Sequence, residues 1–339
     1  MKSSNESLSQ LLAKMRKGHP TLKEIYGSPN QGVEIAMIDA FVVDSEKFEA
    51  LINEDPNSER ILKPFVDGAK LKRWSVDTLE SWLICTPKGK VNIDDYPAVK
   101  RHLLAFRPQL EKRDSNQAWF ELDEALASFV DQMEKPKISF AGKADRPSFF
   151  MDPEGGFLSH DSFFAGQADF YLAGLLNSET YWKLLKGAEA RTGGDWHDVG
   201  LQEVAMLPIP DADGFQRGGI GRSADFCQRA IKERNDLVKH FQGMTAYNLS
   251  PEGLNAKLSD RLRNWFFLDF ASFRDEIIKT FGQDIPADDL ELWENYLEQE
   301  KQKVIKLNAD IAHAERQIEE VVYAIFGLTK DEIKLIEQA

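Results

Sequence analysis

The sequence has 339 residues, 42% of them hydrophobic, and a formal net charge of −14. It is long and apolar enough for one large or two ordinary folded domains. Its two cysteines are too few for a disulfide scaffold or a cysteine-based zinc site. No apolar run approaches the roughly 18 to 20 residues that span a bilayer, and Met1–Gly18 lacks an apolar signal core. We therefore expect a cytoplasmic protein.

Short helices and strands are predicted in the first third of the chain. Leu8–Lys17 has apolar residues on one helical face. Ala40–Asp44 is a β-prone run, and Asp44 or Ser45 can cap a following helix. Trp82–Cys85 predicts another strand.

The middle of the chain alternates β-prone runs with turn signals. A helix is expected after Pro97, because proline is favoured at the first helical position. Ile138–Pro210 mixes short predicted strands with one helix near Asp169–Leu176. Gly214–Gly221 contains four glycines, which favours a flexible linker over a regular element. We therefore predict a domain boundary there, with one domain over residues 1–213 and another over 214–339.

The second predicted domain is helical. Apolar residues alternate three and four apart from Leu290 to Ile325, and only Glu300 interrupts them. This spacing predicts one long helix with a coiled-coil-like seam, and Leu254–Phe281 offers a matching apolar face as its partner. The predicted fold class is therefore α+β, a mixed α/β domain followed by a long antiparallel helical hairpin.

Charge is distributed unevenly along the chain. Arg60–Arg113 holds twelve basic and six acidic residues, whereas Asp284–Ala339 holds fourteen acidic and six basic residues. A basic block in an acidic protein indicates a surface that faces a polyanion. The alternative is an ordinary solvent-exposed surface on which the charge is unevenly distributed. From the charge alone, this alternative is favoured.

Sequence motifs for catalysis are largely missing. An amino-methyltransferase needs a glycine-rich loop after a strand and a loop with a Pro-Pro pair, but the chain has no Pro-Pro pair. Gly218–Gly221 does not follow a hydrophobic strand. Trp196–Asp198 contains a His-Asp pair, but no Ser or Cys nucleophile lies in a suitable turn to complete it. Asp152–Gly156 is more typical of a turn than of a metal site. We predict no catalytic residue and no metal site in this chain.

Seven stretches follow one another along the chain, namely Asp55–Trp74, Tyr96–Leu104, Leu110–Arg113, Trp119–Leu122, Leu175–Ser178, Leu207–Pro210 and Val321–Thr329. In this order and spacing they resemble the C-terminal specificity region of type IIG restriction-modification methyltransferases, which has a TaqI-like specificity domain. One departure is Gly32–Ala36, where the family usually has a Gly-x-Lys-Thr-Gly-like turn, so a DNA contact by this turn is in doubt. The larger departure is that the methyltransferase domain, which precedes this region in relatives, is absent. This implies a split subunit or a truncated form.

The resemblance implies that residues 1–213 form a target-recognition domain for double-stranded DNA. Its partner would be a methyltransferase or endonuclease subunit or domain, and S-adenosylmethionine would bind the missing catalytic domain, with no cofactor in this chain. The expected phosphate-binding residues are Lys70, Lys72, Arg73, Arg101, Arg107 and Arg113. The candidates for base readout are Lys143, Arg146, Lys186, Arg191 and Arg217. Trp74 and Trp119 are expected in the core and not as stacking platforms.

Three functions remain open at this point. The first is sequence-specific DNA recognition for an adenine-N6 methyltransferase of a restriction-modification or phage-defence system, without catalysis by this chain. The second is an acidic adaptor that docks a partner of a defence system through its C-terminal helices, in one form by mimicking DNA. The basic block argues against mimicry. The third, an independent enzyme, is the weakest because both methyltransferase signatures are missing.

Overall fold

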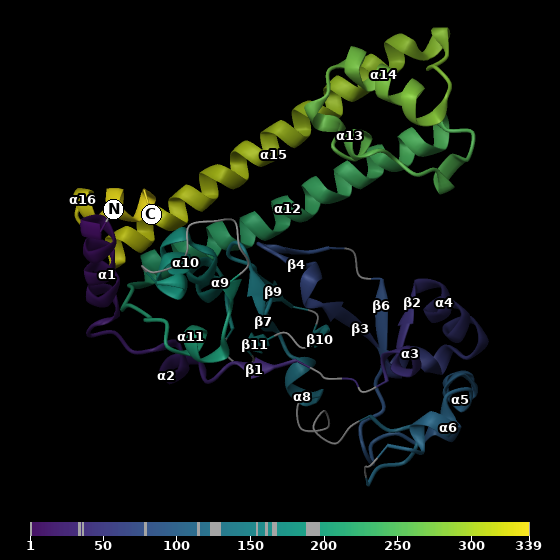
Figure 1. The fold of residues 1–339 in the computed structure, drawn as a ribbon, viewed down its shortest axis with the longest axis horizontal. Coiled ribbons are helices and arrows are strands. Elements are labelled where there is room, and N and C mark those ends of the chain that lie inside the picture. The colour runs from purple at the N-terminus through teal and green to yellow at the C-terminus, as the bar shows by residue number, and fades with distance from the viewer. Residues whose placement is uncertain are drawn as a thin grey trace. The chain divides into compact units, whose positions relative to one another are not determined.

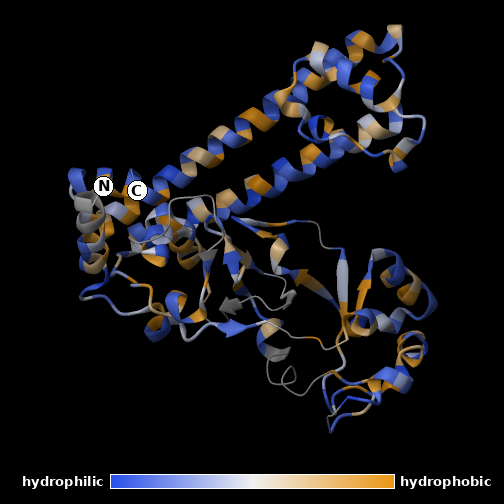
Figure 2. Ribbon diagram, in the orientation of Figure 1, coloured by the Kyte–Doolittle hydropathy of each residue, from blue (hydrophilic) through white to orange (hydrophobic). Residues whose placement is uncertain are grey.

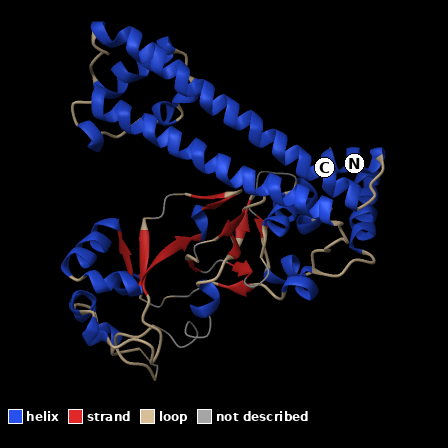
Figure 3. Ribbon diagram, turned by 180° about the vertical axis from the view of Figure 1, so that it is seen from behind, coloured by secondary structure: helices blue, strands red, loops and turns tan. Residues whose placement is uncertain are grey.

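The computed structural model describes residues 2–32, 35, 37–77, 80–113, 116–122, 130–153, 155–159, 162–164, 168–187 and 197–338. The chain forms two compact units, one of Met1–Ala224 with Ile318–Ala339 and one of Asp225–Gln317. The fold class is α+β, as predicted, with small sheets in the first unit and helices in the second (Figures 1 and 3). In the part of the chain that is described, no helix is both long and apolar enough to cross a membrane.

One sheet of the first unit has the strand order β10-β3-β6-β2. Its strands are β2 (Val42–Asp44), β3 (Leu62–Asp67), β6 (Ser81–Ile84) and β10 (Phe157–Ser159). β10 is parallel to β3, and the other pairs are antiparallel. The predicted strand over Trp82–Cys85 is thus confirmed as β6. The predicted run over Ala40–Asp44 is a strand only in its second half, because α3 (Ile38–Phe41) occupies the first.

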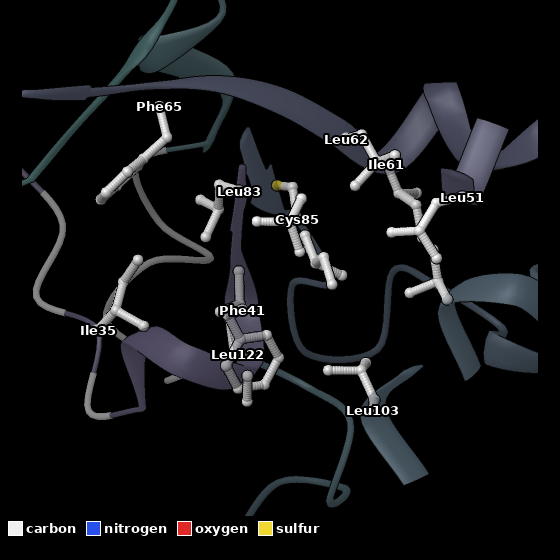
Figure 4. Close-up of a cluster of buried hydrophobic side chains, with 14 of the residues drawn as sticks. Ile35, Phe41, Leu51, Ile61, Leu62, Phe65, Leu83, Cys85, Leu103 and Leu122 are labelled. Atoms are coloured by element: carbon white, nitrogen blue, oxygen red, sulfur yellow. The ribbon is translucent and has the colours of Figure 1, made fainter. Parts of the chain in front are cut away.

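Helices pack on this sheet and close a hydrophobic core. α4 (Ser45–Glu54) begins as predicted, since Asp44 Oδ1 accepts from Lys47 N at 2.8 Å. α5 (Pro97–Leu104) also begins at the predicted proline and is followed by α6 (Arg107–Leu110). Figure 4 shows Leu103 of α5 with Phe41, Leu83 and Cys85 in this core, and all four are buried.

The second sheet is antiparallel, with the order β1-β11-β7-β9. Its strands are β1 (Asn30–Gln31), β7 (Lys137–Phe140), β9 (Phe149–Asp152) and β11 (Ser162–Phe164), next to the short helix α8 (Val130–Met133). Two further ribbons are β4 (Leu71–Lys72) with β5 (Ser75–Val76), and β8 (Lys143–Ala144) with β12 (His197–Asp198).

Helices that are far apart in sequence complete the first unit. They are α1 (Lys2–Arg16), α2 (Leu22–Tyr26), α9 (Phe170–Asn177), α10 (Glu179–Lys186), α11 (Leu201–Ala205) and α16 (Lys330–Glu337). The predicted helices near Leu8 and after Asp169 are confirmed as α1 and α9. α16 contacts α1, and Lys14 Nζ lies 2.7 Å from Glu332 Oε1.

The glycine-rich linker predicted over Gly214–Gly221 was wrong, because α12 (Gly214–Leu249) begins at Gly214. The close approach of α9 to α12 depends on a glycine outside this run, because a Cβ on Gly174 of α9 would lie 2.3 Å from Ile220 Cγ2. A Cβ on Gly221 would make only an ordinary contact, 3.6 Å from the backbone N of Tyr171. The compact units correspondingly divide after Ala224 and not at the boundary of 213 and 214.

The second unit is built on α12 and α15 (Leu290–Ile325), the predicted long helix. Its partner is α12, so the prediction that Leu254–Phe281 is the partner helix was wrong. The two run antiparallel, with Arg234 Nη1 donating to Asn308 Oδ1 at 3.1 Å (Figures 1 and 3). Figure 2 shows hydrophobic and hydrophilic residues alternating along both helices.

The segment after α12 folds into α13 (Asp260–Arg263) and α14 (Phe270–Phe281). Its long-helix pattern is broken because the side chains of Ser259 and Asp269 cap new helices. The core is aromatic: Phe241 and Trp265 stack with ring centroids 3.9 Å apart, and Phe273 and Trp293 pack beside them. The segment therefore caps one end of the hairpin.

Candidate nucleic-acid interface

The β4–β5 hairpin carries three of the predicted phosphate-binding residues. Lys70 and Lys72 are exposed. Arg73 is half-buried, and its Nη2 donates to the main-chain oxygen of Asn177 at 2.7 Å. Its Nη1 also lies 3.5 Å from Glu179 Oε1. Lys72 Nζ donates to the main-chain oxygen of Ala69 at 2.9 Å but stays exposed, whereas the Arg73 guanidinium fastens the hairpin to the junction of α9 and α10.

Trp74 fixes this hairpin by an unusual backbone conformation. Its φ is 64°, and no other non-glycine residue in the described part of the chain has a positive φ. Such a conformation favours glycine and costs about 1–3 kcal/mol in other residues. The Trp74 side chain is only 1% exposed, and its N donates to Phe149 O at 3.4 Å. Burial of the indole offsets the strain, and the prediction that Trp74 is a core residue is confirmed.

The turn between β8 and β9 lies next to Lys72. Arg146 Nε lies 3.3 Å from Asp145 Oδ1, and this hydrogen bond lowers the pKa of Asp145. The charge of Lys72 also lowers that pKa, and β4 contacts β9, the strand that follows the turn. Two cations that are 74 residues apart in sequence therefore act on one carboxylate.

The β8–β12 ribbon extends this surface. Lys143 on β8 and Asp198 on β12 are cross-strand partners, and Lys143 Nζ lies 3.8 Å from Asp198 Oδ1. Both side chains are largely exposed, at 73% and 85%. Asp198 also lines a hollow of about 270 Å³ with Lys186 and Trp182. Burial and the neighbouring Lys183 lower the pKa of Lys186, whose ammonium lies 5.5 Å from the Trp182 ring centroid.

These contacts bring together five predicted DNA-binding residues from separate segments. We call this set the basic strip: Lys70, Lys72, Lys143, Arg146 and Lys186. Lys70 lies just before β4 and Lys72 on it, Lys143 lies on the β8–β12 ribbon, Arg146 in the β8–β9 turn and Lys186 at the end of α10. Exposed ammonium and guanidinium groups on such elements can bind phosphates of a nucleic acid backbone.

Acidic side chains moderate the field at one end of the strip. Lys70 lines a hollow of about 150 Å³ together with Asp67, Asp77 and Glu80. Nearby carboxylates offset part of the attraction of a lysine for phosphate. Lys143 beside Asp198 and Arg146 beside Asp145 are offset in the same way.

Three other predicted phosphate-binding residues lie on α5, on α6 and just after α6. Arg101 pairs with Glu54, and Arg107 Nε lies 2.6 Å from Glu111 Oε1. Arg113 is used inside the unit, because its Nη2 donates to the main-chain oxygens of Trp119 at 2.9 Å and Glu121 at 2.8 Å. The structure thus joins none of the three to the strip through a contact that involves described residues.

Arg217 lies in the first turn of α12, apart from the strip residues. Its Nη2 is 3.3 Å from Asp169 Oδ2 and 3.4 Å from the Tyr26 hydroxyl. The guanidinium lies 4.1 Å from the Tyr171 ring centroid. These contacts brace α12 against α2 and α9. Arg191, the remaining base-readout candidate, lies outside the described residues.

The acidic turn at Asp152 has an internal role. Asp152 Oδ2 accepts from Lys137 Nζ at 2.7 Å and from Gly156 N at 2.8 Å, while Oδ1 accepts from Gly155 N at 3.0 Å. The carboxylate is therefore occupied by protein donors. Among the described residues no group of three or more His, Cys, Asp and Glu side chains is placed to hold a metal ion.

Asp198 is the residue that the sequence did not assign to this surface. We considered it only as part of a His-Asp pair, because its sequence neighbours suggested a loop. The pairing of β8 with β12 places it against Lys143, and that pairing joins residues 55 apart in the chain. No local pattern carries this information.

Comparisons with known proteins give limited matches. Residues 215–322, from the second residue of α12 to near the end of α15, match a family described as a domain of unknown function (DUF8810). No curated protein matches the sequence. Among solved structures, the type IIL restriction-modification enzyme MmeI in complex with DNA is similar, with 14% sequence identity and a TM-score of 0.44. The match covers 82% of this chain but 36% of that one, so this chain spans about a third of that enzyme's length. A likeness of this size carries no argument about fold or function.

Proposed function

We propose that this chain recognises specific sites on double-stranded DNA for an adenine-N6 methyltransferase of a restriction-modification or phage-defence system. The chain itself is non-catalytic, and S-adenosylmethionine binds a separate catalytic domain or subunit. The observation that carries the proposal is the convergence of five cations, predicted from separate segments as DNA contacts, in the basic strip. The ordered sequence phrases that resemble type IIG specificity regions supply the link to methylation.

The arrangement of the strip suits both parts of such a task. Exposed lysines on β4 can bind phosphates and set the position of the protein on the duplex. Lys143, Arg146 and Lys186 lie on a ribbon, a turn and a helix end, from which long side chains can reach base edges. Arg73 and Arg113 are left out of the proposed interface because their part-buried guanidinium groups donate to main-chain oxygens, and Arg217 because its contacts brace α12. Lys143 and Arg146 are kept because they pair with exposed carboxylates.

A salt series with labelled random duplex DNA tests the proposal. If Lys70 and Lys72 each contact a phosphate, they contribute about −1.8 to the slope of the logarithm of the binding constant against the logarithm of salt concentration. The Lys70→Ala/Lys72→Ala variant should bind more weakly to all sequences, with a slope about 2 units shallower.

The matched control is Lys257→Ala/Lys306→Ala, which makes the same charge change at two exposed lysines of the second unit. It should bind as the wild type does. Absence of binding at low salt, or equal weakening in both double variants, would contradict the proposed interface. Binding of labelled S-adenosylmethionine to the purified chain would contradict the non-catalytic assignment.

A second candidate is an acidic adaptor that docks a partner protein through the C-terminal helices. The second unit favours it by exposing large apolar side chains, namely Phe267 at 77%, Leu254 at 69%, Leu292 at 65% and Tyr247 at 65%. Exposed apolar side chains of this size can mark a protein interface when they are contiguous. An adaptor without a DNA role would show no salt-dependent DNA binding, so the same series separates the two functions.

A further inference from the structure

We infer that Asp198 and Lys143 read one base pair in the major groove through an exocyclic amino group, the N4 amine of cytosine or the N6 amine of adenine. This inference rests on the proposed DNA-recognition function and assigns a specificity-determining carboxylate to it. Asp198 accepts a hydrogen bond from the amine, and Lys143 donates to an acceptor of the same base pair.

The first argument is the shape of the element that carries the pair. Lys143 and Asp198 face each other across the β8–β12 ribbon, which has two strands. The major groove is about 12 Å wide and admits a two-stranded ribbon. The cations of the adjacent β4 hairpin and β8–β9 turn then lie where they can hold the flanking backbone.

The second argument is that this ion pair opens at little cost. Its two groups are 3.8 Å apart and their side chains are 73% and 85% exposed. Exposed ion pairs contribute little to stability, so exchange of this contact for contacts to DNA is easy. Arg73 and Arg113 differ, since both have close hydrogen bonds to main-chain oxygens.

The third argument concerns the carboxylate itself. A carboxylate among DNA phosphates is repelled unless it meets a hydrogen-bond donor, and the amines of cytosine and adenine are the donors on the major-groove edge. Thymine O4 and guanine O6 are acceptors, so either base would place a second acceptor against the Asp198 carboxylate. The carboxylate would then be buried without a hydrogen-bond donor. Asp198 therefore discriminates chiefly by rejecting the wrong base.

The neighbouring hollow supports the same chemistry. It has a volume of about 270 Å³ and is lined by Trp182, Lys186, Asp198 and Glu203 among others. Lys186 is a second donor beside Asp198. The hollow thus holds donors and acceptors together, and the edges of C·G and A·T pairs present an amine next to carbonyl and N7 acceptors.

Selection of bound duplexes from a randomised library tests the inference with the full chain. The wild type is expected to require cytosine or adenine at one position, and Asp198→Ala is expected to accept every base there. Asp145→Ala is the matched control, because it removes a carboxylate of the same surface. It should bind all sequences more tightly without a change of preference.

Base analogues then identify the amine in the selected duplex. Replacement of the cytosine by 2-pyrimidinone, or of the adenine by purine, removes only the amino group. The wild type should lose on the order of 10-fold in affinity for one of these duplexes. Asp198→Ala should bind the modified and unmodified duplexes equally.

The outcomes separate this inference from the function on which it rests. If the wild type and Asp198→Ala both bind DNA and select the same bases, the inference that Asp198 reads a base would be overturned. The proposed DNA-recognition function would remain. Selection of no preferred sequence by the wild type would overturn both.

Discussion

Asp152→Ala should destabilise the first unit by about 3–5 kcal/mol, the usual cost of removing one partner of a buried ion pair. Lys137 is fully buried, and its Nζ lies 2.7 Å from Asp152 Oδ2. At that distance two unit charges attract by roughly 6 kcal/mol at an effective dielectric constant of about 20, and desolvation offsets part of this. The variant leaves the ammonium buried with the main-chain oxygen of Met133, 2.8 Å away.

The deficit should depend on pH in a defined direction. Burial lowers the pKa of Lys137, whereas Asp152 raises it, so the variant retains only the lowering effect. A lysine whose pKa is lower in the folded than in the unfolded state destabilises the protein at every pH at which it is buried in its charged form. That cost disappears as pH rises through the folded pKa toward the unfolded value of about 10.4. The deficit should therefore be largest near neutral pH and shrink in alkali.

Amide hydrogen exchange of β7 and β9 measures this effect for the first unit alone, which matters because a chain of two units need not unfold in one step. The control is Lys137→Met/Asp152→Asn, which removes both charges and keeps an acceptor for the Gly155 and Gly156 amides. It should recover most of the loss. A deficit of less than about 1 kcal/mol, or one that does not change with pH, would refute the reasoning.

Three further predictions concern packing and reactivity. Gly174→Leu should destabilise the α9–α12 contact, since even a Cβ would lie 2.3 Å from Ile220, and thermal unfolding should show a lower midpoint. Glu300→Leu should stabilise the second unit by about 1 kcal/mol or more and so raise its unfolding midpoint, because Glu300 is 7% exposed within the apolar seam; a lower midpoint would show that its pair with Lys303 is needed. Cys85 should resist alkylation at pH 8 until the protein unfolds, because burial raises its pKa to about 12, and rapid labelling of the folded chain would contradict this.

Local signals predicted most of the individual elements. Asp44, Pro97 and Asp169 begin helices where capping chemistry favours them, and the alternation from Leu290 to Ile325 is one helix. These features depend on neighbours in the sequence. They therefore need no knowledge of tertiary contacts.

The failures came from contacts between distant segments. Glycine runs predict flexibility, but Gly214–Gly221 begins α12, and α9 packs against this helix through Gly174, which only the folded chain shows. The same holds for the partner of α15. α12 was not predicted as that partner, because its first residues were expected to form a linker. Caps at Ser259 and Asp269 divide the segment that was expected to be that partner.

The candidate site shows the same division. Residue type and local charge gave the list of cations, but not which of them have internal partners. Arg113 and Lys72 look alike in sequence and both donate to main-chain oxygens, but the Arg113 guanidinium is part-buried whereas Lys72 is exposed. Asp198 joins the surface only through strand pairing across 55 residues.

The most direct test of the central claim is the ratio of two affinities at one physiological salt concentration. The duplex selected from a random library and a scrambled duplex of the same composition are compared with the purified chain. The account predicts a ratio of about 1,000 or more, the lower end for site-specific DNA-binding proteins. Equal affinities would contradict site-specific recognition, even if both were strong.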